Sequence, residues 1–375
     1  MTLKPAYLRY IFILQGLVLL VAVLWWLSAI LVPFGFAAIL AVLLNPVNNW
    51  LMRKRMPRLL AISLTVTLGI LVVAGLLYFL IVQATQFADA IPQLQQRVNE
   101  YQAELQTWLR KEYNISRKVQ LQYFQRGMDT FLTDSGTYAL SVLTALSDAA
   151  LILTIIPVYI FLLLLYKPNL VHFIRQVFAT ERTSHSKVGE ILTEVKVVVQ
   201  AYMSGMLIEA AIIALLNVGA LLILGIPYAL LLGVLAAILN MIPYIGGIIG
   251  TALPMFIAVI STPDGLADAA GVLIAFLVIQ FLDNNIIQPR IVASKVRINA
   301  LFTVIAVLAG NMLWGVGGMF LAIPIIAILK IIFDRVEELQ PYGMLLGDQI
   351  PGVDETPSLN EARRTVARDE PAETA

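Results

Sequence analysis

The sequence predicts an all-α polytopic membrane protein with about eight transmembrane segments, and three observations lead to that prediction. Of its 375 residues, 59% are apolar and only 13% are charged, whereas soluble domains carry about 25% charged residues. The mean hydropathy is +0.85. Several apolar runs approach the length of about 20 residues that a helix needs to cross a hydrocarbon core about 30 Å thick.

The same composition argues against several classes of function. The formal net charge of +1 gives no reason to expect a nucleic-acid partner. The chain has no cysteine, so it has no disulfide, thiolate metal site or cysteine nucleophile. The sequence also lacks a Gly-rich loop ending in Lys-Ser/Thr and a His-Glu-x-x-His metal motif. We therefore expect neither an enzyme nor a protein that holds a cofactor.

Residues 1–83 are predicted to form three transmembrane helices, over the apolar runs 10–32, 34–51 and 59–83. The first run has 23 residues and no small-residue cleavage site after it, so we expect a retained helix rather than a signal peptide. Basic residues precede the first run and separate the second from the third, which places both basic groups on the cytoplasmic side. These basic residues are Lys4, Arg9, Arg53, Lys54, Arg55 and Arg58.

Residues 84–137 are predicted to be an extracytoplasmic amphipathic helical segment, and Pro92 suits the first turn of its helix. One interpretation is that the helix packs on its own protomer or lies in the membrane interface. The other is a subunit contact, because the apolar spacing averages near 3.5 residues. The apolar positions that recur every three or four residues are Ile91, Leu94, Val98, Tyr101, Leu105 and Trp108.

Residues 138–166 are predicted to form a fourth transmembrane helix, followed by a cytoplasmic connector over 167–199 that contains one amphipathic helix. The two histidines of the chain, His172 and His185, lie in this charged stretch without a second ligand set, and we interpret them as solvated. The chain ends in a predicted cytoplasmic tail over 334–375, which is polar and aperiodic toward its end and therefore partly disordered.

The remaining segment, 200–333, is predicted to be a transport core with an internal repeat. Two similar phrases begin 71 residues apart, NMIPYIGG at 240–247 and NMLWGVGG at 311–318. Each lies between apolar runs of about 15 to 18 residues, which are short for a span. Proline removes a backbone donor and glycine supplies backbone freedom, so each phrase is predicted to break a helix. We therefore predict two helix–break–helix hairpins, over 228–260 and 299–333.

The two hairpins are predicted to form an inverted-topology repeat. The first begins outside, after span 200–224, and the second begins in the cytoplasm, after span 266–282 and a basic loop. Each is either re-entrant or a pair of short crossings, and a chance match between two apolar phrases is the remaining alternative. Interrupted segments at matching positions of two halves indicate a transporter binding site, because their unpaired backbone groups need a wet cavity.

Polar residues inside this core are the candidates for binding. Glu209 lies within a predicted span, where a charge costs about 2.5–3.5 kcal/mol on insertion scales. One interpretation is that Glu209 carries a proton or cation during transport. The other is that it has a structural role, either paired with a basic residue or protonated in a pocket lined by protein. Asp283 and nearby amides offer oxygen ligands for cations, and an ordinary polar helix end explains them as well. Asn240 and Asn311 precede the two breaks, where they either cap the second half-helix or bind a solute.

The full set of substrate- or ion-binding candidates adds the small residues of both breaks, whose backbone would line the site. The two carboxylates are the candidate coupling groups, with H⁺ or Na⁺ as the coupling ion. The set is Glu209, Asn240, Pro243, Gly246, Gly247, Asp283, Asn284, Asn285, Gln288, Arg290, Asn311, Gly317 and Gly318.

Three motifs stand in order in this core: P-Y-I-G-G-x-x-G at 243–250, D-N-x-x-x-x-P at 283–289 and G-V-G-G-M-F-L-A-I-P at 315–324. Together they resemble the autoinducer-2 exporter family, also described as PurR-regulated-permease-like. The resemblance implies a bacterial inner-membrane carrier of about eight spans that forms homo-oligomers, as pentamers. Members are associated with export of autoinducer-2, and some with sodium or lithium/proton antiport. Many carry Leu-His-Pro after the second motif, whereas residues 296–300 read VRINA here, so neither a specific substrate nor a histidine-based proton role transfers from the resemblance.

Sequence and resemblance together predict a secondary transporter that works by alternating access. It would export a small polar, autoinducer-2-like solute or exchange cations of the Na⁺/H⁺ type. A passive channel and a non-transporting membrane scaffold are the alternatives. The expected partners are the lipid bilayer, a small-molecule or cation substrate and further copies of the chain, in a bacterial inner membrane with both termini cytoplasmic.

Overall fold

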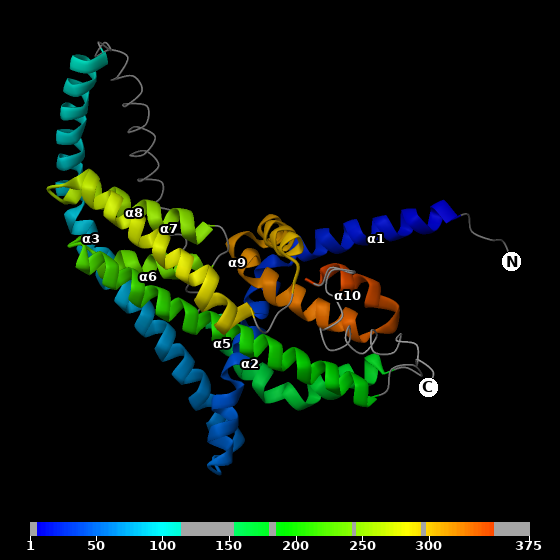
Figure 1. Ribbon diagram of the computed structural model, residues 1–375. Coiled ribbons are helices and arrows are strands. Elements are labelled where there is room, and N and C mark those ends of the chain that lie inside the picture. The colour runs from blue at the N-terminus through cyan, green and yellow to red at the C-terminus, as the bar shows by residue number, and fades with distance from the viewer. Residues whose placement is uncertain (1–5, 114–153, 180–184, 242–244, 294–297, 349–375) are drawn as a thin grey trace, which may run out of the picture.

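The computed structural model describes residues 6–113, 154–179, 185–241, 245–293 and 298–348, and every regular element within them is helical (Figure 1). Six helices in this part of the chain are long and apolar enough to cross a membrane, by length and composition. The predicted all-α class is therefore confirmed for the described residues. The exact number of crossings and their direction stay predictions.

The first two helices meet at Leu27, ahead of the proline at which the sequence suggested a boundary. α1 spans Ala6–Trp26 and α2 spans Ser28–Arg53. Pro33 lies buried inside α2, where it removes one backbone donor without ending the helix, because the side chains around it continue to pack. α1 leaves the bundle as a separate arm (Figure 1), and most of its large apolar side chains are exposed.

α3 spans Arg58–Tyr113, a single helix of 56 residues, which is about 84 Å long at about 1.5 Å per residue. The sequence suggested a third span that ends at 83 and a separate helix that begins near Pro92. The structure instead joins them, because α3 runs through Pro92 without ending. A proline costs one hydrogen bond and a bend, which the long helical stretches on both sides outweigh. Residues 114–137 of the predicted insert lie outside the described residues.

The predicted connector, 167–199, is not a separate helix. Its residues belong to the end of a helix over Thr154–Phe178 and to the start of α5, which spans His185–Ile223. Val188 and Val199 are buried, so α5 gains packing over this stretch and continues into the apolar part of the bundle. Residues 138–153 of the predicted fourth span lie outside the described residues.

The first predicted hairpin is formed by α6 (Ala229–Asn240) and α7 (Ile245–Ser261). A Cβ placed on Gly250 would lie 3.2 Å from the Cβ of Ala236, and one on Gly246 would meet the backbone at the end of α6. The paired positions advance in opposite directions along the chain, so the two helices are antiparallel. Small residues at their interface let the two backbones approach closely.

The second predicted hairpin lies inside α9, which spans Ala300–Arg335. The chain leaves helical geometry at Trp314 and Gly315, where glycine adopts a φ of 61° and a ψ of −145°, a backbone conformation that side-chain-bearing residues rarely adopt. A Cβ on Gly318 would lie under 3.0 Å from the carbonyl oxygen of Gly310, whereas residues eight apart in a straight helix are about 12 Å apart. α9 therefore consists of two arms that fold back on each other.

Both ends of the second hairpin lie at the same side of the molecule. The backbone N–H of Asn299, just before α9, donates to the carbonyl oxygen of Leu346 at 2.9 Å. Leu346 ends α10 (Gln340–Leu346), which follows the second arm after a short 3₁₀ turn, η3 (Glu337–Leu339). The residues before and after the hairpin are therefore held together.

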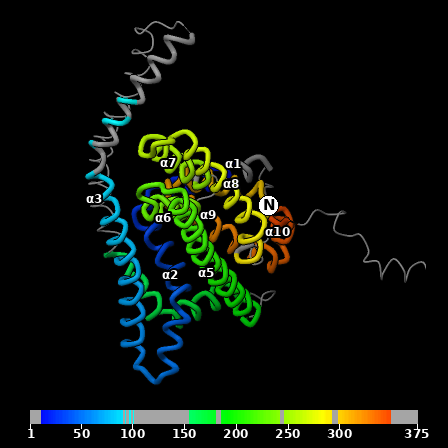
Figure 2. The backbone as a smooth tube through the Cα atoms, turned by 60° about the vertical axis from the view of Figure 1, so that its left-hand side comes forward, coloured from blue at the N-terminus to red at the C-terminus, as the bar shows by residue number. Residues whose placement is uncertain are grey.

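The two hairpins enter the bundle from opposite ends of α5 (Figure 2). Arg335, at the end of the second hairpin, forms an ion pair of 2.8 Å with Glu194 near the start of α5. The backbone N–H of Ile226, just before the first hairpin, donates at 2.9 Å to the carbonyl oxygen of Leu221 in the last turn of α5. This is the relative arrangement that an inverted repeat requires, and its direction in a bilayer stays a prediction.

α8 spans Gly265–Leu282 and continues as two π-helical turns, η1 (Asp283–Ile287) and η2 (Pro289–Ala293). The interpretation of Asp283 as part of an ordinary polar helix end is wrong, because Asp283 is only 2% exposed and the chain stays helical beyond it. Each π turn inserts an extra residue, which re-aims the following side chains and is frequent at functional sites.

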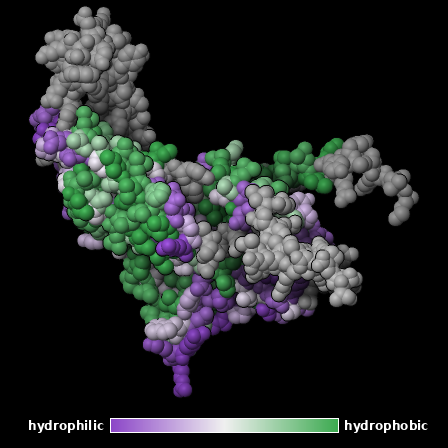
Figure 3. All heavy atoms as spheres, viewed as in Figure 1, coloured by the Kyte–Doolittle hydropathy of each residue, from purple (hydrophilic) through white to green (hydrophobic). Residues whose placement is uncertain are grey.

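The surface is apolar over much of the face seen in Figure 3, whereas hydrophilic residues gather at the turn between α2 and α3. Large exposed apolar side chains include Leu71 and Val72 on α3 and Ile274 and Phe281 on α8. An apolar surface of this extent needs to be covered, and a lipid bilayer provides that cover.

Gly318→Ala is expected to destabilise the protein, because the added Cβ would force the two arms of α9 apart. Overpacking of this kind costs about 1–3 kcal/mol, so the midpoint of thermal unfolding in detergent should fall. Gly219→Ala is the matched control, since nothing lies within 4 Å of a Cβ at that helical position. The control should unfold at the wild-type temperature or slightly above it. Equal midpoints for the two variants would mean that the arms are not in contact.

Candidate functional site

A cavity of about 540 Å³ lies in the middle of the bundle, where α5, the end of α6, the end of α8 and the start of α9 meet. Its size falls within the range of small-molecule sites, about 300–1,000 Å³. Its apolar lining comes from residues such as Met206 and Ile323, and its polar lining comes from several helices. The polar residues are Tyr202, Glu209, Asn240, Gln280, Asp283, Asn284, Gln288 and Thr303.

Asp283 is the most deeply buried acid of this cavity. Its Oδ2 accepts a hydrogen bond of 3.0 Å from Nδ2 of Asn240, which is the last residue of α6. Its Oδ1 is buried and has no hydrogen-bond partner. The π turn that begins at Asp283 therefore meets the tip of the first hairpin through one polar contact, and one carboxylate oxygen is left for a further partner.

Glu209 faces Asp283 from the middle of α5. Both carboxyl groups line the same cavity, and their charges interact across it. Glu209 is half-buried, whereas Asp283 is buried. Two carboxylates that face one cavity repel each other when both are ionised.

A second, much smaller cavity of about 20 Å³ adjoins the first, because Asn240, Gly247 and Gln280 line both. Asn217 of α5 also lines it and is buried. This volume holds about one water molecule. The small glycines of the first hairpin thus leave room for polar contact between the hairpin and α5.

The structure brings together most of the candidates from α5, α6 and α8. Glu209, Asn240, Gly247, Asp283, Asn284 and Gln288 line the larger cavity, and Gly246 lines the smaller one. Pro243 lies outside the described residues.

Other candidates lie away from the cavity. Asn285 donates at 2.8 Å to the carbonyl oxygen of Phe281 within its own helix. Gly318 packs on Gly310 across the second hairpin, and a Cβ on Gly317 would meet the side chain of Val32. Asn311 and Arg290 are absent from the lining of the larger cavity. The second hairpin reaches the cavity through Ala300 and Thr303 at the start of its first arm and Ile323 in its second arm, rather than through its glycine tip.

Sequence reasoning missed four polar residues of the two cavities. Asn217 and Gln280 lie inside long apolar runs, and a polar side chain in such a run is itself a signal of a buried polar site. Gln280 donates at 3.2 Å to the side chain of Asn284, one helical turn away. Tyr202 and Thr303 carry no local signal, because they reach the cavity only through the packing of distant helices.

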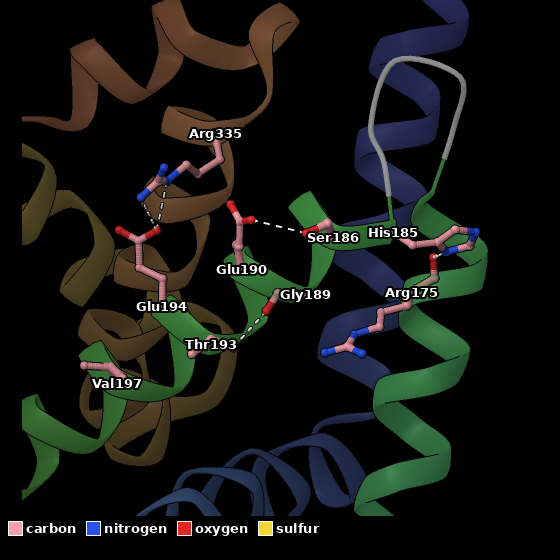
Figure 4. Close-up of a pocket in the computed structure, with 9 residues that line it drawn as sticks. All are labelled: Arg175, His185, Ser186, Gly189, Glu190, Thr193, Glu194, Val197 and Arg335. Atoms are coloured by element: carbon pink, nitrogen blue, oxygen red, sulfur yellow. Dashed lines mark hydrogen bonds and ion pairs between the residues drawn. The ribbon is translucent and has the colours of Figure 1, made fainter.

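A third, open cavity of about 800 Å³ lies at the end of the bundle where α5 begins (Figure 4). Several of its polar side chains already have partners: Arg335 forms an ion pair with Glu194, and Nδ1 of His185 lies 3.2 Å from the carbonyl oxygen of Arg175. The two sequence-predicted coupling carboxylates are not part of it. We therefore take the cavity of about 540 Å³, which contains both carboxylates, as the candidate site and call it the central cavity.

The family model of AI-2E family transporters matches residues 14–338. The chain belongs to the AI-2E transporter family. The matched range includes every described helix of the core and the whole candidate site, so a role in membrane transport follows for this chain. As a member of a transporter family with several long apolar helices, it is a multi-pass membrane protein.

Relatives of this transporter cover nearly its whole length. It is 25% identical to TqsA of Escherichia coli (strain K12), over 91% of this chain and 96% of that protein, and TqsA is named an AI-2 transport protein. It is 26% identical to YueF of Bacillus subtilis (strain 168), over 84% and 86% of the two chains. It is 27% identical to YrrI of the same organism, over 82% and 87%. The names of the last two refer to transport and give no substrate.

Thr303→Cys is expected to react with a small water-soluble thiol reagent, because Thr303 lines the central cavity. The protein has no cysteine of its own, so no background has to be removed. Thr65→Cys is the matched control, since Thr65 is 0% exposed and, like Thr303, bonds a carbonyl oxygen four residues earlier. The control should stay unlabelled. An unreactive Thr303→Cys in membranes would mean that water does not reach the cavity.

Proposed function

We propose that this AI-2E family member is a secondary transporter that moves a small polar solute or exchanges cations by alternating access. The observation that supports the proposal is the pairing of Glu209 with Asp283 in a polar cavity at the tip of the first hairpin. Acidic side chains are rare within membrane spans and are usually functional there.

The acid pair supplies the coupling chemistry of the proposal. A single charge in mid-span costs about 2.5–3.5 kcal/mol on insertion scales, and two adjacent carboxylates add mutual repulsion. One proton or one monovalent cation between them removes both penalties. Oδ1 of Asp283 lacks a hydrogen-bond partner, and carboxylate and amide oxygens are the ligands that hard cations take. H⁺ and Na⁺ can therefore compete for the same position.

The rest of the cavity supplies the solute chemistry. Tyr202, Gln280 and Thr303 add hydroxyl and amide groups around a volume of about 540 Å³. Such groups bind a small polar molecule through several hydrogen bonds without requiring a charge on it. An autoinducer-2-like solute fits this description, in line with the name of TqsA.

The two opposed hairpins are the elements whose movement would alternate access to the cavity. The first hairpin presents Asn240 at the cavity, and the base of the second hairpin is tied to α5 by the ion pair of Arg335 with Glu194. Movement of one hairpin against α5 would open the cavity toward one side while the other hairpin keeps the other side closed. We place both termini in the cytoplasm of a bacterial cell and the protein in a homo-oligomer, as the basic clusters and the family resemblance suggest.

Glu209→Gln and Asp283→Asn are each expected to reduce ion-coupled flux to below about a tenth of wild type, because each removes a group that the coupling ion needs. The measurement is uptake or efflux in proteoliposomes under imposed proton and sodium gradients, with labelled autoinducer-2 or ²²Na⁺ as the transported species. Asp264→Asn is the matched control, because Asp264 is exposed at the start of α8 and makes no side-chain capping bond.

The outcomes separate three functions. Wild-type flux in both acid variants would remove Glu209 and Asp283 from the mechanism. Linear flux that neither saturates nor depends on an ion gradient would indicate a channel. A wild-type protein that is folded and oriented in the vesicles but moves no solute or cation would favour a scaffold.

A further inference from the structure

Three basic side chains gather away from the transport cavity, where α2, α3 and the helix Thr154–Phe178 meet α5. Nζ of Lys167 donates at 2.9 Å to Oδ1 of Asn45, and the charges of Lys196 and Arg58 lie close to that of Lys167. Arg58 also donates to the carbonyl oxygen of Leu165. We call Arg58, Lys167 and Lys196 the basic cluster.

The basic cluster has no acidic partner within the part of the chain that the structure describes. The ion pairs at this end of the bundle join other residues, Lys187 with Glu337 and Arg335 with Glu194. Lys167 and Lys196 are both half-buried, so water screens their repulsion less than it would on an open surface. Like charges held together in this way favour a bound anion.

A buried polar group beside the cluster independently points to a ligand. Asn45 is 3% exposed, and its Oδ1 is taken by Lys167 while its Nδ2 has no hydrogen-bond partner. Asn48, one helical turn further along α2, is 4% exposed, and its unpaired atom is the acceptor Oδ1, so only Asn45 offers a free donor to an anion. An unpaired buried donor costs about 1–3 kcal/mol. An anion held by Lys167 would lie within reach of Nδ2 of Asn45 and could accept its hydrogen bond.

We propose that the basic cluster binds a phosphate group, carried by the headgroup of an anionic phospholipid or free in solution. The lysine ammonium binds phosphate as a compact positive charge, and the arginine guanidinium can donate two parallel hydrogen bonds to it. The side-chain amide of Asn45 adds an uncharged donor. Exposed apolar side chains on the same three helices, Trp50, Leu59 and Leu162, offer a surface for acyl chains. Basic pockets between transmembrane helices are suited to anionic lipid headgroups.

The phosphate site is separate from the proposed transport site. Lys196 precedes Glu209 by 13 residues of continuous helix, which is about 20 Å along α5. Binding at the basic cluster can therefore be measured separately from transport through the central cavity.

The test is native mass spectrometry of the full chain, purified in detergent and stripped of lipid. Dioleoylphosphatidylglycerol, dioleoylphosphatidylcholine and inorganic phosphate are titrated in separate arms. We expect wild type to bind the phosphatidylglycerol at least about tenfold more tightly than the phosphatidylcholine, and Lys167→Gln or Lys196→Gln to reduce that difference about tenfold. Lys167→Arg keeps the charge and should retain binding, which guards against a folding defect in the glutamine variants.

Lys54→Gln is the matched control, because Lys54 lies in the same basic region but stacks 3.9 Å above the ring of Trp50, outside the cluster. It should bind phosphatidylglycerol as wild type does. Binding of inorganic phosphate that depends on Lys167, without a preference between the two lipids, would support the site and assign it to free phosphate. Equal binding of both lipids with no phosphate bound, or equal effects of Lys54→Gln and Lys167→Gln, would overturn the proposal.

Discussion

Peptide groups that leave a helix inside an apolar layer must find partners within the protein, and this constraint organises the core. The chain breaks twice, between α6 and α7 and at Gly315 inside α9, and each time the two arms fold back on each other. Small residues at the contacts, Gly250 with Ala236 and Gly318 with Gly310, bring the backbones close enough to shield the break. α5 then provides the continuous helix against which both hairpins pack, from opposite ends.

The candidate site lies beside the end of α6 and the start of the first π-helical turn. Asn240 ends α6, Asp283 begins a π-helical turn, and their side chains meet in a cavity that also contains Glu209. Both positions interrupt the regular α-helical backbone, since α6 ends at Asn240 and the chain follows a π-helical path from Asp283 to Ile287. A polar cavity with two acids therefore lies beside two interruptions of regular helix.

Much of this fold could be predicted because its signals are local. Glycine and proline mark the breaks, and Gly315 adopts a positive φ of 61° at the predicted position. A charge within an apolar run is equally visible, which is why Glu209 was found, and Asp283 was found because an acid and two amides directly follow such a run. Tyr202 was not found, because its place in the cavity depends on packing between distant helices. Gly318 was assigned to the site because its sequence phrase resembles the one at the first hairpin. Similar sequences at the two breaks did not place the two tips at equivalent positions relative to the cavity.

The length of α3 has a mechanical consequence. Its 56 residues form one helix that passes the bundle and extends well beyond it. Where it passes, the ring of Phe87 packs edge-on against Tyr228, with ring centroids 5.2 Å apart, at the residue that precedes α6. A displacement of α3 at Phe87 would therefore act on the residue that precedes the first hairpin, whereas Pro92 separates this contact from the far end of the helix. The first hairpin, which presents Asn240 at the candidate site, is thereby in contact with a helix that reaches far outside the bundle.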